Sequence, residues 1–158
     1  ALVEVDITRG NLDPLPIAVS PLYLEPGSID IKQGDKIIKN VGEKISKVIE
    51  VNFRRSGLFN PLKKDSFVQK PDIAHVKPRF EDWRLIKAQA LVTGKVTVTE
   101  NKLRAEFRLW DVVAAKEMTR TAMIVFANDS GIPMDSINAP PPKTNAVALL
   151  AVACAQES

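Results

Sequence analysis

The chain has 158 residues, a mass of 17.4 kDa, 45% hydrophobic residues and a mean hydropathy of -0.05, which is the size and composition of one folded domain. Its single cysteine, Cys154, excludes an internal disulfide and a cysteine-cluster metal site, and its single histidine, His75, excludes a zinc site with two histidines. The formal net charge of +3 is unevenly distributed: residues 1–31 carry -4, residues 32–64 carry +6 and residues 65–158 carry +1.

The first segment is predicted to be an arm over residues 1–15. Its residues 2–8, LVEVDIT, alternate apolar and polar side chains and can form a strand, but five glycine, asparagine, aspartate and proline residues between 10 and 16 interrupt the pattern. The chain begins at Ala1 instead of Met, which favours a signal peptide that has been removed; a cytoplasmic protein is the alternative. A short buried strand is predicted within residues 17–24.

Residues 35–55 show the clearest helical period in the chain, with Asp35 as the predicted N-cap and Gly57 as the stop. The apolar face carries Ile37, Ile38, Val41, Ile45, Val48, Ile49 and Phe53. The other face carries the basic residues Lys36, Lys39, Lys44, Lys47 and Arg54. A solvated basic face is the simpler interpretation, and a phosphate or nucleic-acid surface is the alternative.

Further along the chain, a turn is predicted at residues 58–61, a short strand at 67–68, a loop at 71–78 that holds an exposed His75, and a short helix at 80–90. Residues 91–99, 103–113 and 118–126 are predicted to be three successive strands of a β-meander. Alternation in the second strand places Leu103, Ala105, Phe107 and Leu109 on one face and Arg104, Glu106, Arg108 and Trp110 on the other.

The last segment, residues 128–158, is turn-rich and contains three consecutive prolines, which predicts a flexible linker. A short helix is possible at residues 146–156. The apolar run AVALLAVACA at 146–155 is too short to span a membrane, so no integral membrane segment is predicted.

The sequence lacks the motifs of the common enzyme classes. There is no GxxxxGK[ST] or GxGxxG phosphate loop and no GxSxG nucleophile elbow, and neither Ser130 nor Cys154 has a suggestive context. Glu81, Asp82 and Asp111 could pair as acid and base only if the fold brought two of them together. The sequence therefore favours a binding module over an enzyme, and no cofactor or metal is expected.

Four blocks of sequence together resemble the N-terminal domain of the TolB family. They are ITRGNLDPLPIAV at residues 7–19, RRSGLFNPL at 54–62, FEDWRLIKAQALVTGKV at 80–96 and LRAEFRLWDVVAAKEM at 103–118. The resemblance covers about residues 3–126. It implies an α/β domain at residues 16–127, with helices packed on one side of a mixed sheet, similar to the anticodon-binding domain of class II aminoacyl-tRNA synthetases.

The resemblance also implies a periplasmic, non-enzymatic role in the Tol-Pal system, in outer-membrane integrity, envelope constriction at division, and protein and bacteriocin import. The partner implied is the C-terminal domain of TolA, bound through the arm by strand addition. The implied binding residues are Leu2, Val3, Glu4, Val5, Asp6, Ile7, Thr8, Arg9, Gly10, Asn11, Leu12 and Asp13. An ordinary edge strand is the alternative role for this arm.

Two departures from the family pattern limit what the resemblance implies. The chain lacks the C-terminal β-propeller with which the family binds Pal, so Pal binding is not expected. Residues 130–158 match no family element, and we hypothesise that this tail reflects a frameshifted or truncated gene. A basic nucleic-acid-binding domain remains the alternative function, motivated by the charge of +6 over residues 32–64, although nucleic acid is not the expected partner.

Overall fold

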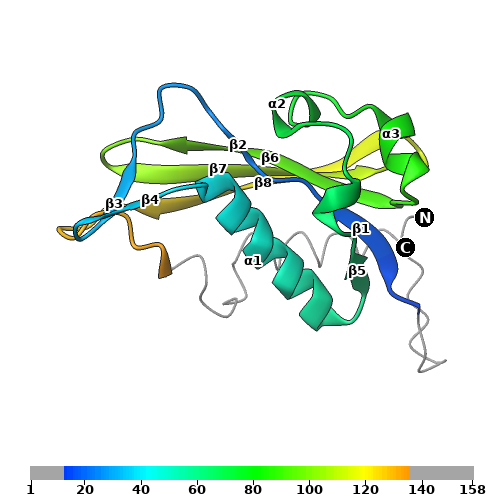
Figure 1. Ribbon diagram of the computed structural model, residues 1–158, viewed down its shortest axis with the longest axis horizontal. Helices are drawn as coiled ribbons and strands as arrows, with labels where there is room; N and C mark the ends of the chain where they lie inside the picture. The colour runs from blue at the N-terminus through cyan, green and yellow to red at the C-terminus, as the bar shows by residue number, and fades with distance from the viewer. Residues whose placement is uncertain (1–12, 136–158) are drawn as a thin grey trace.

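The computed structural model describes residues 13–135 (Figure 1). The predicted strand at residues 2–8 and the possible helix at 146–156 lie outside the described residues. The centre of the fold is a six-stranded mixed sheet. Five of its strands lie in the order β5 (Phe59–Pro61), β1 (Leu15–Val19), β6 (Ala90–Val98), β7 (Lys102–Asp111) and β8 (Lys116–Phe126), and β2 (Tyr23–Leu24) also pairs with β6. A second sheet consists of the two short strands β3 (Ile31–Gln33) and β4 (Lys36–Ile38).

The three longest strands form the predicted antiparallel meander. They are β6 (Ala90–Val98), β7 (Lys102–Asp111) and β8 (Lys116–Phe126), joined by short turns. The predicted alternation in β7 is confirmed: Leu103, Ala105, Phe107 and Leu109 are buried in the main core. Trp110 lies on the other face, as predicted, and is buried there in a second cluster with Ala74 and Trp83. The pairing of β7 with β8 shifts between Leu109 and Trp110, where β8 has one extra residue.

The remaining strands of the large sheet run parallel to β6 or β1. The predicted strand within residues 17–24 is divided into β1 (Leu15–Val19), which pairs with β6 and β5, and β2 (Tyr23–Leu24), which pairs further along β6. The predicted turn at 58–61 is wrong, because β5 (Phe59–Pro61) pairs with β1. The strand can include Pro61 because it lies at the sheet edge, where a missing N–H costs no ladder bond.

The predicted helix at 35–55 is correct only from residue 41 onward. A hairpin of β3 (Ile31–Gln33) and β4 (Lys36–Ile38) comes first, and helix α1 (Val41–Ser56) begins after Asn40. Gly34, with φ of 65°, provides the left-handed residue that the two-residue hairpin turn requires. Ile37 and Ile38 of β4 match the 3.6-residue period of α1 by coincidence. Two residues are too few to distinguish a strand from a further helical turn. Gly57 ends the helix as predicted.

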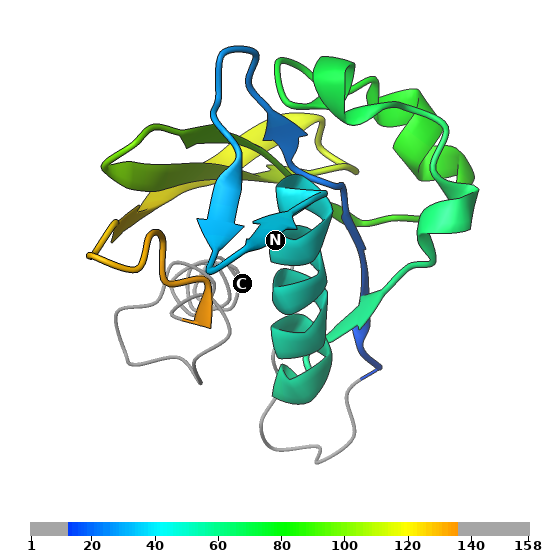
Figure 2. The ribbon, with the colours of Figure 1, turned by 60° about the vertical axis from the view of Figure 1, so that its left-hand side comes forward.

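The long helix α1 packs on one face of the sheet, which confirms the predicted α/β class with a mixed sheet (Figure 2). Its buried residues include Ile45, Ile49 and Phe53. They share a core with the inward-facing residues of β1, β6 and β7. Past β8, Ile132 and Met134 are also buried in this core, beside β3, where Gly131 approaches the carbonyl of Lys32.

Two short helices occupy one end of the opposite face, α2 (Pro71–Ala74) and α3 (Phe80–Leu85) (Figure 1). The predicted helix at 80–90 thus ends early, and α2 lies inside the predicted loop at 71–78. The predicted strand at 67–68 is absent; a 3-10 turn, η1 (Lys64–Ser66), precedes Phe67, which packs edge-to-face on Trp83 with 5.0 Å between ring centroids. The buried Gln69 Oε1 accepts hydrogen bonds from Trp83 Nε1 and the Arg79 backbone N–H, both at 2.9 Å.

Candidate functional site

The structure fixes the point from which the predicted binding arm leaves the domain. Leu2 through Leu12 lie outside the described residues, and Asp13 is exposed just before β1. The Leu15 N–H donates to the Leu58 carbonyl at 2.9 Å, and the Gln89 N–H donates to the Pro16 carbonyl at 3.0 Å. From its first residues, β1 is therefore hydrogen-bonded on both sides.

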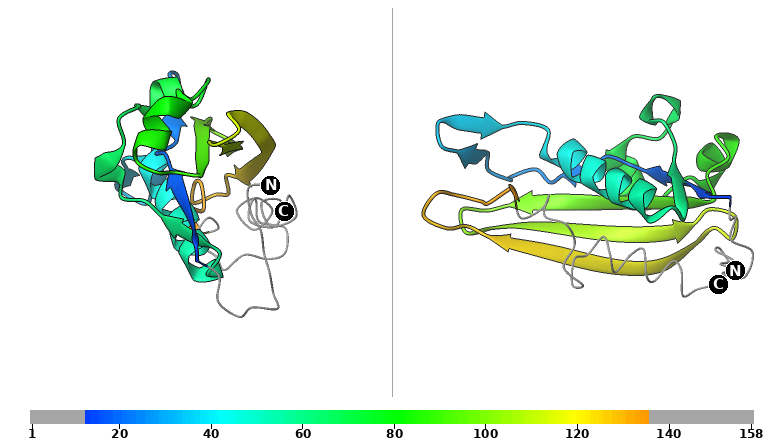
Figure 3. Two further views of the ribbon diagram at one scale, coloured as in Figure 1. Left: turned by 90° about the vertical axis from the view of Figure 1, so that its right-hand side faces the viewer. Right: turned by 90° about the horizontal axis from the view of Figure 1, so that it is seen from below.

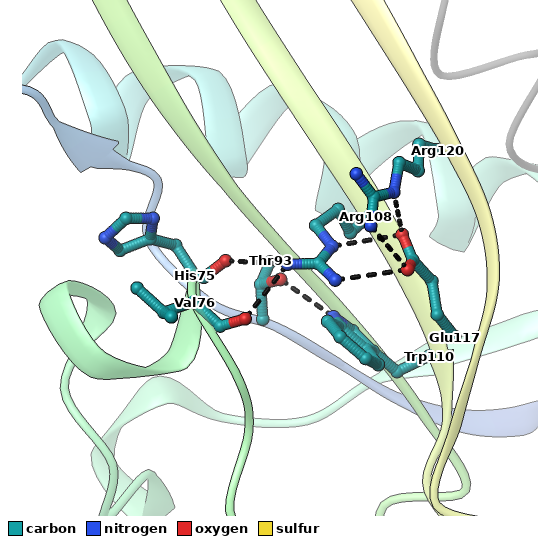
Figure 4. A network of polar contacts seen from close by, with 7 residues as sticks. All are labelled: His75, Val76, Thr93, Arg108, Trp110, Glu117 and Arg120. Atoms are coloured by element: carbon teal, nitrogen blue, oxygen red, sulfur yellow. Dashed lines mark hydrogen bonds and ion pairs between the residues drawn. The ribbon is translucent and has the colours of Figure 1, made fainter.

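A network of polar contacts centred on Arg108 joins the end of α2 to β7 and β8 (Figure 4). Arg108 Nη1 donates to the carbonyls of His75 and Val76, at 3.2 and 3.0 Å. Its Nε and Nη2 atoms bind the two carboxylate oxygens of Glu117, at 3.0 and 3.1 Å. The guanidinium carbon also lies 4.2 Å from the centre of the Trp110 ring.

The carboxylate at the centre of this network is strongly stabilised in its charged form. Glu117 accepts hydrogen bonds from Arg108 and also from Arg120, and these bonds lower the pKa of Glu117 to about 2. A hydrogen bond from Arg104 is the main cause that lowers the pKa of Glu106 in the same face. Both carboxylates are therefore anions at neutral pH and are already paired with arginines.

Beside this network, the sheet surface forms a groove of about 550 Å³. Four cationic side chains line it, Lys95, Arg104, Arg108 and Arg120, with Glu106 as the acidic residue among them. Lys95 lies within 3.5 Å of Glu25 and 3.4 Å of Glu106. The groove therefore has an excess of positive charge, in spite of its ion pairs.

The basic face of α1 is less positive than the sequence indicates. Lys44, Lys47 and Arg54 are exposed on it, but the buried Glu50 lies 3.6 Å from Lys47 and 3.5 Å from Lys64. The predicted helical positions Lys36 and Lys39 precede α1. Among the described residues, no aromatic side chain accompanies these cations at the exposed surface, so the stacking platform of single-strand binders is not formed there.

Two of the three acidic side chains considered as catalytic candidates, Asp82 and Asp111, have local structural partners. Asp82 pairs with Arg79 at 2.9 Å, and Asp111 accepts a hydrogen bond from the Ala114 N–H at 2.9 Å in the turn after β7.

His75, predicted to be exposed in a loop, is half-buried and stacks on Tyr23 with 4.5 Å between ring centroids. Burial lowers the pKa of His75, and nearby Lys95 contributes.

Over residues 13–135, the fold assembles no group of three or more metal-ligating side chains, and it contains no helix that is long and apolar enough to cross a membrane.

The Arg108 network was not predicted from the sequence. Alternation placed Arg108 and Trp110 on one face, but the contact with Glu117 depends on the register shift between β7 and β8, for which the sequence gives no signal.

The fold is that of a small α/β domain with a mixed sheet. The chain belongs to the family of the TolB amino-terminal domain, whose model matches residues 3–118. A relative from Pelagibacter ubique (strain HTCC1062), the Tol-Pal system protein TolB, is 64% identical over 127 residues, which cover 77% of this chain. The chain spans only 27% of the length of that relative.

Solved structures share the fold at low sequence identity. TolB from Acinetobacter baumannii has a TM-score of 0.54 and 18% identity, over 75% of this chain and 25% of that chain. The PelC dodecamer from Paraburkholderia phytofirmans has a TM-score of 0.53 and 10% identity, over 89% of this chain and 87% of that chain.

Proposed function

We propose that this chain is a non-enzymatic, periplasmic interaction module of the Tol-Pal envelope system. In this proposal it docks on the C-terminal domain of TolA through its N-terminal arm, residues 2–13, and so contributes to outer-membrane integrity, constriction at division and protein import. Family membership across residues 3–118 is the observation that carries the proposal. The exposed attachment of the arm at Asp13 supports it.

The chemistry of the arm suits strand addition to the edge of a partner sheet. Its apolar residues Val3, Val5 and Ile7 alternate with the acidic residues Glu4 and Asp6. In strand addition, backbone hydrogen bonds supply affinity and alternate side chains supply selectivity. The acidic residues would steer the arm toward a basic partner, mainly by raising the association rate.

The first test is calorimetric titration of the TolA C-terminal domain with the intact chain and with the chain lacking residues 1–13. The truncation leaves every described sheet hydrogen bond of β1 in place, since the first of them is made by Leu15. We expect binding by the intact chain and none by the truncated chain, with circular dichroism showing that both are folded.

A matched pair of variants separates the arm from general electrostatics. Glu4→Lys with Asp6→Lys should weaken binding and reduce its salt dependence. The control, Asp65→Lys with Asp72→Lys, makes the same charge change at exposed residues in η1 and α2 and should leave binding unchanged. Equal effects of the two pairs, or binding by the truncated chain, would reject docking through the arm.

A further inference from the structure

The outer margin of the sheet is formed by β8, an edge strand of 11 residues (Figure 3). Within the described residues, β8 pairs only with β7. In the part of the chain that the structure describes, no strand pairs with its other side, and the backbone N–H and C=O groups of such an edge can pair with another extended chain.

The second half of this edge lacks the features that usually protect an edge strand. Residues 121–126, TAMIVF, contain no charged side chain and no proline, and Ile124 and Phe126 are 41% and 68% exposed. The register shift in the β7–β8 pair lies at Leu109 and Trp110, opposite the first half of β8. Long, apolar, uncharged edges are uncommon on isolated domains because they pair readily with other strands.

Cations flank this apolar segment on the face opposite α1. In the β7–β8 register, Arg104 lies across from Ile124 and Lys102 lies across from Phe126. Arg120 precedes the segment on β8 and its side chain is 69% exposed, while that of Arg104 is 44% exposed. The groove lined by Arg104 and Arg120 includes Ala122 of the edge strand, so side chains of an added strand that face this side would reach these cations.

We propose that β8 binds an extended acidic segment of a partner protein, which adds as a strand beside residues 121–126 and places carboxylates near Arg104 and Arg120. Pairing of β8 with a second copy of the chain is less favourable, because it would bring the cations of two copies together. The proposal does not depend on TolA docking, since it uses a different surface and a different strand.

The probe is an acetylated, fluorescently labelled peptide, Thr-Val-Glu-Val-Glu-Val-Thr, titrated into the full chain and followed by anisotropy. We expect saturable binding, and about tenfold weaker binding of the same peptide with lysine in place of glutamate, the effect of exchanging two exposed ion pairs for repulsion. Amide chemical-shift changes should map to β8. Absence of binding, equal binding of both peptides, or shifts confined to other strands would overturn the proposal.

Two N-methylated peptides test strand addition itself. A strand donates to a given neighbour only from alternate residues, so methylating one alternate set of peptide nitrogens should abolish binding and methylating the other set should not. Loss of binding with both sets, or with neither, would contradict pairing along the edge.

Matched protein variants test the charge. Arg120→Glu should weaken peptide binding by about tenfold, whereas Lys44→Glu, the same charge change at an exposed residue of α1, should leave it unchanged. Equal effects of the two would show that net charge, not the edge, governs binding.

Two alternative occupants give distinct results. The arm also alternates valine with acidic residues at Val3, Glu4, Val5 and Asp6, so peptide binding only after removal of residues 1–13 would assign the edge to the chain's own arm. A dimer in sedimentation analysis that Ile124→Lys dissociates would assign it to a second copy. Either result would overturn the partner proposal, and neither would by itself reject docking on TolA.

Discussion

Replacement of Arg108 by alanine should destabilise the domain by about 2–3 kcal/mol. Two of its hydrogen bonds reach the carbonyls of His75 and Val76 at the end of α2, and two more reach Glu117. The bidentate ion pair contributes about 1 kcal/mol, since both side chains are 22% exposed and partly screened by solvent. The two carbonyl contacts together contribute about 0.5–1 kcal/mol, and the contact with the Trp110 ring contributes about the same.

The assay is urea-induced unfolding followed by far-UV circular dichroism, because tryptophan fluorescence would respond directly to changes at Trp110. Arg108→Lys keeps the charge but not the planar fork of donors, and should recover part of the loss. Arg104→Ala is the matched control, since the side chain of Arg104 is 44% exposed and its pair with Glu106 should contribute less than about 1 kcal/mol. The reasoning fails if Arg108→Ala and Arg104→Ala destabilise the chain equally.

Three further substitutions test other contacts. The folded-state pKa of Glu117 is about 2, below its ordinary value of 4.5. The stability that its ion pairs contribute is therefore fully present above about pH 4.5 and is lost as the pH falls toward 2. In unfolding titrations, Glu117→Gln should lose less stability on acidification than the wild type does. Gly42→Ala should lower the free energy of unfolding in urea by at least about 1–3 kcal/mol, because a Cβ at residue 42 would lie 1.9 Å from the Leu22 carbonyl oxygen. An unchanged free energy of unfolding would contradict this close approach. Trp83→Phe should cost about 2 kcal/mol by the same assay, through lost volume and the lost hydrogen bond to Gln69, and Phe67→Leu, at a half-buried neighbour, should cost less.

The meander could be predicted because its signals are local. Alternation of apolar and charged residues from Leu103 to Arg108 fixes which face of β7 enters the core, and short polar turns join the strands. The same local reasoning placed the stop of α1 at Gly57, where a left-handed residue is needed.

The errors arose where a segment depends on distant partners. Residues 59–61 form a strand only because β1 lies beside them, and without that neighbour the sequence has the composition of a turn. The β3-β4 hairpin was missed because Ile37 and Ile38 extend the helical period, although Gly34 and Asp35 between two short runs are a hairpin signal.

The polar network around Arg108 and the exposed edge of β8 also could not be predicted from the sequence. Arg108 and Glu117 meet through strand register, and the outer position of β8 follows from the strand order of the whole sheet. The predicted arm from Leu2 to Leu12 lies outside the described residues, and its role remains a prediction that rests on its sequence and on the family.

The most direct test of the central claim, docking on TolA through the arm, uses a synthetic peptide of residues 1–13 in place of the domain. The peptide alone should bind the TolA C-terminal domain in a calorimetric titration and should displace the intact chain from it in competition, because the account places the recognition in this segment. Failure of the peptide to bind or compete, while the intact chain binds, would place the recognition in the folded domain and contradict the account.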